Sequence, residues 1–100
     1  MIMKIVVKNA GEKPVVKEIK GELNEMQEIV GGYIEAFHVM DDILCVCNEE
    51  GKLIGLQPNF VLMNDVVVGN VFFVSAGEED FESLNNEQIA LLLRLFGFLV

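Results

Sequence analysis

One histidine and two cysteines are the side chains of this 100-residue chain that most often act as bases, nucleophiles or metal ligands. His38 has no serine or cysteine near it in a recognised nucleophile setting, although a triad is recognised by geometry and not by sequence order. Cys45 and Cys47 lie two residues apart, so in a strand they share one face at a separation that an unstrained disulfide does not readily span. With a single histidine, they also fall short of a four-ligand zinc site unless a second subunit completes it. We therefore expect reduced, buried thiols and no metal.

Neither the carboxylates nor the glycines form a known catalytic or phosphate-binding motif. The EF-hand loop, the Walker pattern and Gly-x-Gly-x-x-Gly are all absent from the sequence. The acidic run at residues 78–80 reads most simply as a solvated loop, with a weak divalent-cation site as the alternative. The glycine pair Gly31–Gly32 follows a predicted helix, whose C-terminal dipole end repels an anion. We predict that the chain is not an enzyme and carries no cofactor.

One stretch, residues 48–59, is rich in residues that set backbone conformation and leave polar groups facing outward. It reads Asn-Glu-Glu-Gly-Lys-Leu-Ile-Gly-Leu-Gln-Pro-Asn. Exposed backbone amides in such turns can hold an anion without lysine or arginine. The alternative is that these residues only make turns. If the chain has a ligand site, we expect it to include Gly31, Gly32, Glu35, Asn48, Glu49, Gly51, Pro58 and Asn59.

The charge balance restricts the possible partners. Sixteen acidic residues against seven basic ones give a net charge of −9. This argues against direct binding to nucleic acid, whose phosphates proteins neutralise with lysine and arginine, and against adsorption to an anionic membrane. The acidic surface would either keep a small apolar domain soluble or imitate nucleic acid and occupy a basic groove on another protein.

Length and hydropathy favour one globular, cytoplasmic domain over residues 1–100. One hundred residues suffice for a single modest core, and 52% of them are hydrophobic. The chain has no apolar run near the ~20 residues that span a membrane. Its N-terminus is too short for a signal peptide.

Hydrophobic periodicity predicts the elements that position these residues. Two helices are expected, one over residues 22–30, ended by the glycine pair, and one that begins after Asn85 with Gln88 closing a capping box. Strands are expected over residues 2–8, 15–19, 33–39, 43–47, 52–56 and 66–75. Gly69–Asn70 could split the last of these as a bulge or a tight turn.

The resulting order is β-β-α-β-β-β-β-α. Adjacent strands with few crossovers imply an α+β domain with a mainly antiparallel sheet and both helices packed on it. The strand over residues 15–19 carries lysines and a glutamate, which suits a sheet edge. The strand over residues 43–47 is apolar on both faces and belongs in the middle of the sheet.

The last helix and the tail are almost wholly apolar, with Arg94 the lone charge over residues 89–96. Such a helix should be buried on several sides, and one small domain has limited surface with which to cover it. We therefore predict a homo-oligomer, with folding back on the sheet as the alternative. The predicted interface consists of Leu92, Leu95, Phe96, Phe98 and Leu99.

Four segments together resemble a small family of uncharacterised proteins. They are Val-Gly-Gly-Tyr-Ile-Glu at residues 30–35, the turn-rich stretch at 48–59, Asp-Val-Val-Val-Gly-Asn-Val-Phe-Phe-Val at 65–74 and Ser-Leu-Asn-Asn-Glu-Gln-Ile at 83–89. The chain resembles the domain of unknown function numbered 3846, found in phages, plasmids and conjugative elements. It departs from that family at residues 57–60, where a second proline and a basic residue are expected.

The resemblance implies that the protein is encoded by a mobile genetic element, and it implies no activity. Small accessory proteins of mobile elements often blunt host defences, and two mechanisms fit. In the first, an oligomer sequesters a nucleotide-like immune signal in pockets built from the turns; the turn cluster and apolar tail favour it slightly. In the second, the acidic surface blocks a nucleic-acid-handling defence protein. A structural or regulatory interaction module is a third possibility.

Overall fold

The computed structural model describes residues 2–97, which form eight strands and two helices. The strands are β1 (Met3–Lys8), β2 (Val15–Ile19), β3 (Ile34–Met40), β4 (Ile43–Asn48), β5 (Pro58–Leu62), β6 (Asp65–Val68), β7 (Val71–Ala76) and β8 (Phe81–Glu82). The helices are α1 (Leu23–Val30) and α2 (Asn86–Phe96). Neither helix is long and apolar enough to cross a membrane.

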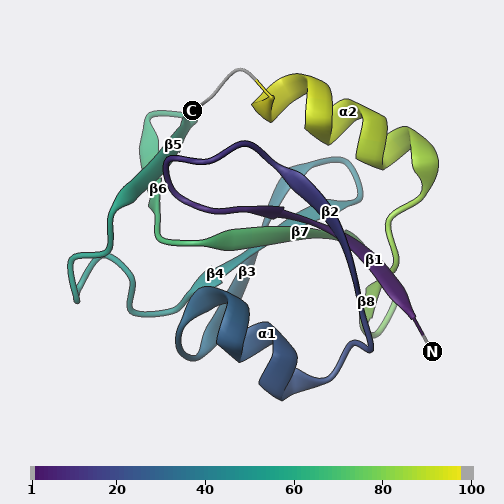
Figure 1. Cartoon of the computed structure of the whole chain (residues 1–100), viewed down its shortest axis with the longest axis horizontal. Helices are drawn as coiled ribbons and strands as arrows, with labels where there is room; N and C mark the ends of the chain where they lie inside the picture. The colour runs from purple at the N-terminus through teal and green to yellow at the C-terminus, as the bar shows by residue number, and fades with distance from the viewer. Residues whose placement is uncertain (1, 98–100) are drawn as a thin grey trace.

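A central antiparallel sheet has the strand order β2-β1-β7-β4-β3, with β8 paired to the end of β7 (Figure 1). A second sheet is the two-stranded hairpin of β5 and β6. The predicted α+β class and antiparallel pairing are therefore confirmed, as is the general order of two strands, a helix, a run of strands and a final helix. The structure also confirms that β2 lies at an edge and that β4 lies inside the sheet.

The prediction was wrong for one strand in the middle of the chain. Residues 52–56 were expected to be a strand, but residues 52–55 form consecutive turns, and the next strand begins only at Pro58. For residues 66–75 the structure shows the expected alternative of a split at Gly69–Asn70. The two halves are strands of different sheets, because Gly69 adopts a left-handed conformation (φ 79°) and turns the chain. Apolar alternation cannot distinguish these outcomes, since the partner strands decide them.

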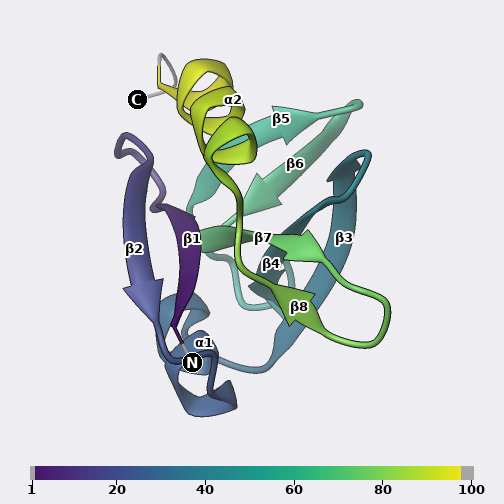
Figure 2. The same ribbon diagram turned by 90° about the vertical axis from the view of Figure 1, so that its right-hand side faces the viewer.

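Each face of the central sheet is covered by its own hydrophobic cluster. On one face, α1 packs through Met26 and Val30 against β1, β4 and β7. On the other face, α2 and the β5–β6 hairpin pack together over Val6, Cys45 and Phe73. Figure 2 shows the sheet between these two layers. A sheet buried on both faces explains why its inner strands β7 and β4 are nearly continuous in apolar residues.

Local sequence fixes the ends of both helices. At α2, Asn85 accepts a hydrogen bond from the Gln88 backbone N–H and its own N–H donates to the Gln88 side chain, both at 2.8 Å. This is the predicted capping box. At the end of α1, Gly31 takes the left-handed cap (φ 78°), and its N–H donates to the Gln27 carbonyl.

Candidate binding cleft

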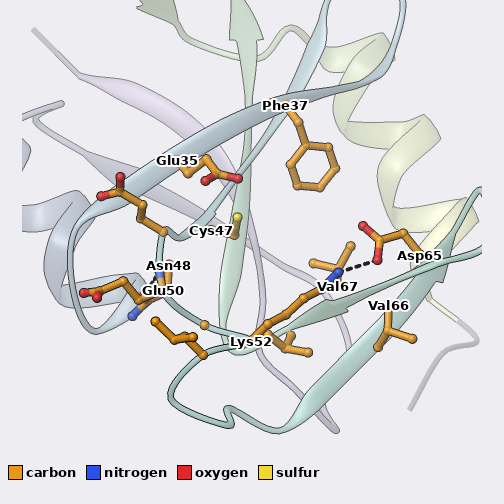
Figure 3. A pocket seen from close by; sticks show the side chains of 13 residues that line it. Glu35, Phe37, Cys47, Asn48, Glu50, Lys52, Asp65, Val66 and Val67 are labelled. Atoms are coloured by element: carbon orange, nitrogen blue, oxygen red, sulfur yellow. Dashed lines mark hydrogen bonds and ion pairs between the residues drawn. The ribbon is translucent and has the colours of Figure 1, made fainter.

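A cavity with a volume of about 580 Å³ lies between the central sheet and the β5–β6 hairpin. Its floor is the face of β3 and β4, one wall is β6, and the turns after Asn48 close one end (Figure 3). The lining residues are Glu35, Phe37, Cys47, Asn48, Glu49, Glu50, Gly51, Lys52, Leu53, Asp65, Val66, Val67 and Val68. We call this cavity the β6 cleft.

Four of the eight predicted ligand residues meet in the β6 cleft: Glu35, Asn48, Glu49 and Gly51. Gly31 and Gly32 lie in a neighbouring hollow of about 260 Å³, which Asn48 also lines. Pro58 is exposed at the start of β5 and lines neither cavity, and the same holds for the half-buried Asn59. The predicted site is thus divided, with Asn48 at the boundary.

Asn48 holds the end of helix α1 to the turn that follows β4. Its side chain is buried, and its Nδ2 donates to the Val30 carbonyl at 3.2 Å. Its Oδ1 accepts from the Glu50 backbone N–H at 2.8 Å. Gly32 has to be glycine here, because a Cβ would lie 2.8 Å from that Nδ2. The carboxamide therefore has a structural role at the rim of the cleft.

Asn59 likewise joins three segments inside the fold. Its Nδ2 donates to the carbonyls of Lys8 and Gly69, both at 2.8 Å, and its Oδ1 accepts from the Lys8 ammonium at 3.1 Å. Lys8 is fully buried, and burial lowers the pKa of its ammonium despite the opposing charge of Glu12. Since this carboxamide keeps a buried cation hydrogen-bonded, Asn59 is not available to a ligand.

The backbone amides of the turns are also largely engaged. The N–H groups of Gly51, Ile54, Gly55 and Leu56 donate to carbonyls within the same segment, and that of Glu49 donates to Tyr33. Gly51 permits this compact arrangement, because a Cβ there would lie 2.9 Å from the Val68 side chain. The turns after β4 therefore offer few free donors of the kind that bind an anion.

Among the charged side chains that line the β6 cleft, acidic ones outnumber basic ones. Glu35, Glu49, Glu50 and Asp65 line it together with a single base, Lys52. The Lys52 ammonium pairs with Asp65, the sole ion pair among the residues the structure describes, and lowers the pKa of that carboxyl. Both partners are exposed, so the pair adds little stability. The other three carboxylates make the cleft attractive to cations.

Sequence reasoning missed Phe37, Cys47, Lys52 and the whole of β6 as lining residues. Strand alternation places Glu35 and Phe37 on one face, which could have added Phe37. Nothing in the sequence indicates that β6 lies across the cleft from β3, because that placement depends on how the hairpin folds back.

Both thiols are reduced, as predicted, but only Cys45 is buried as expected, and Cys47 is half-buried. Cys45 is buried in the core, and burial with a smaller effect of Cys47 raises the pKa of its thiol. Cys47 faces the cleft, where burial and then the Glu35 carboxylate raise its pKa, partly offset by Lys52. A neutral thiol is a poor nucleophile. Across residues 2–97, no group of three or more His, Cys, Asp or Glu side chains is arranged to hold a metal ion.

The predicted oligomer interface needs correction. Leu92 and Phe96 are 0% and 6% exposed within a single chain, where Phe96 packs against the rings of Phe60 and Phe73. The hairpin supplies the apolar cover that the sequence did not reveal. Leu95 is 45% exposed and stays a candidate. Phe98 and Leu99 lie outside the described residues.

Comparison with protein families finds one described as Domain of unknown function (DUF3846), whose model matches residues 3–97. No curated protein matches the chain. No solved structure matches it either.

Proposed function

This chain belongs to the family described as Domain of unknown function (DUF3846), and from that premise we propose that it is a non-catalytic binding protein that blocks a basic partner protein. The partner is a nucleic-acid-handling defence protein of a bacterial host. The setting is the host cytoplasm, where a phage or other mobile element would produce the chain to blunt that defence.

One observation carries the proposal, namely the electrostatics of the β6 cleft. It has four carboxylates against one lysine, and that lysine already pairs with Asp65. The chain as a whole carries a charge of −9. A protein that handles nucleic acid presents a basic groove, and complementary potentials accelerate encounter with such a surface.

The proposal is tested with two matched pairs of adjacent, exposed glutamates. Glu49→Gln/Glu50→Gln removes two charges at the cleft, and Glu78→Gln/Glu79→Gln removes two charges from the loop before β8. The chain is used to isolate its partner from the host, and the affinity of each variant for the purified partner is then measured. We expect the cleft variant to bind about tenfold more weakly, since rim charges affect binding in this range.

The loop variant should bind like the unchanged protein. If both variants bind the partner equally weakly, the glutamates act only through the net charge of the protein and not through their position at the cleft. A partner with an acidic binding surface would contradict the proposal.

A second candidate is the capture of a nucleotide-like immune signal by an oligomer. The volume of the cleft, about 580 Å³, favours it, because small-molecule sites have volumes of ~300–1,000 Å³. The acidic lining and the engaged turn amides oppose an anionic ligand. A rise in melting temperature with cyclic nucleotides or ADP-ribose derivatives would support capture, since a ligand that binds only the folded state stabilises it.

A further inference from the structure

One wall of the β6 cleft is an unpaired strand edge. β6 pairs with β5 on one side only, and all four residues of β6 line the cleft on the other. At about 3.3 Å per residue, this edge is roughly 13 Å long. The edge of β2 is different, because it carries the charged residues Lys17 and Glu18, as is usual for a protected edge.

The backbone groups that β6 turns toward the cleft follow from the hairpin register. Leu62 and Asp65 flank the two-residue turn and form its hydrogen-bonded pair. Residues alternate along an antiparallel strand, so Val66 and Val68 point their N–H and C=O groups away from β5.

The side chains around this edge define what an added strand would carry. Inward-facing side chains would meet the carboxylates of Glu35 and Asp65 over the cleft floor (Figure 3). Outward-facing ones would lie beside Val66, which with its cross-strand partner Val61 forms an exposed apolar pair. Because side chains alternate along a strand, the matching segment alternates basic and apolar residues.

We propose that the β6 cleft binds an extended segment of a partner protein, which pairs with β6 as a third strand of the hairpin sheet. The inference rests on the proposed function as a binder of basic proteins and specifies how such a partner is held. Backbone hydrogen bonds to Val66 and Val68 give affinity, and the inward basic residues give specificity. An incoming cation takes the place of Lys52 on Asp65.

The test uses a fluorescent synthetic peptide of alternating lysine and valine and the unchanged protein. Binding is followed by anisotropy, and amide hydrogen exchange is followed by NMR. We expect the Val66 and Val68 amides to exchange more slowly in the complex, with no such change at Val61. Two further peptides carry N-methyl groups on every lysine or on every valine amide. Only one of the two should lose binding, since alternate amides point to opposite edges of a strand.

Two proline variants form a matched pair on the protein side. Val66→Pro removes an N–H that faces the cleft, and Val61→Pro removes its counterpart on the far edge of β5. Proline is tolerated at edge positions whose N–H faces outward. Val66→Pro should weaken binding about tenfold, in line with the loss of one hydrogen bond, and Val61→Pro should not.

Three results separate the inference from the proposed function. A peptide of alternating glutamate and valine should not bind. Suppose that the glutamate–valine peptide does not bind, but both N-methylated peptides bind equally and amide exchange is unchanged. The protein would then still bind basic partners through its acidic residues, and strand addition would be overturned. Failure of the lysine–valine peptide to bind, while the purified host partner still binds through Glu49 and Glu50, would likewise overturn strand addition alone.

Discussion

At the scale of single residues, the two asparagines that bound the turn-rich stretch act within the fold. Asn48 links helix α1 to the turn after β4, and Asn59 links β1, β5 and the turn at Gly69. Both carboxamides are hydrogen-bonded to backbone groups of neighbouring segments. Their replacement therefore tests stability and not ligand capture.

Asn59→Ala should lower the free energy of unfolding by about 3 kcal/mol, because two backbone carbonyls lose a donor and the buried Lys8 ammonium loses an acceptor. Denaturant unfolding measures the loss. Asn24→Ala is the matched control, since Asn24 is exposed on α1, and it should change stability by less than about 0.5 kcal/mol. Equal effects would contradict the structural role of Asn59.

At the scale of elements, the β5–β6 hairpin builds the cleft and also covers the apolar side of α2. Phe60 lies against both Phe73 and Phe96, with ring centroids 6.1 and 4.8 Å apart. The hairpin thus ties the second helix to the central sheet. Its turn, Met63–Asn64, has positive φ at both positions (49° and 68°), which matches the type I′ turn that suits twisted hairpins.

Met63→Asn should stabilise the protein by roughly 0.5–1 kcal/mol, because asparagine adopts the left-handed conformation at a smaller cost than methionine. Met63 is 88% exposed, so no packing is lost. Leu53→Asn makes a similar change at a position that is 85% exposed and outside the positive-φ set. Thermal unfolding of the two variants should show a gain for the first only. A gain for both would mean that the removal of an exposed apolar side chain, and not the turn conformation, is the cause.

At the scale of the whole molecule, charge repulsion acts on a small fold. Sixteen acidic residues face seven basic ones, and only one ion pair is formed among residues 2–97. Repulsion between like charges opposes the compact state. Moderate salt should relieve it, since the screening length falls from about 30 Å at 0.01 M to about 8 Å at 0.15 M.

The melting temperature should therefore rise as sodium chloride is increased from about 0.01 to 0.15 M. Calorimetry measures the rise. The Glu78→Gln/Glu79→Gln variant, with two fewer negative charges, should show a smaller increase. A melting temperature that falls with salt would mean that attractive charge contacts outweigh the repulsion.

The sequence alone determined what depends on neighbours along the chain. Periodicity located both helices and most strands, and the capping residues placed the start of α2 and the end of α1, because these signals act within a few residues. Composition determined the acidic character of the surface. The same information placed Glu35, Asn48, Glu49 and Gly51 in one candidate site, and the cleft brings those four together.

Only the tertiary structure decided which strand pairs with which and what covers the last helix. Residues 66–75 contribute to two sheets, the hairpin buries Leu92 and Phe96, and the free edge of β6 faces Glu35 and Phe37 across the cleft. Each of these depends on contacts between residues far apart in sequence. The period of side chains along a strand identifies a face but not the partner that covers it.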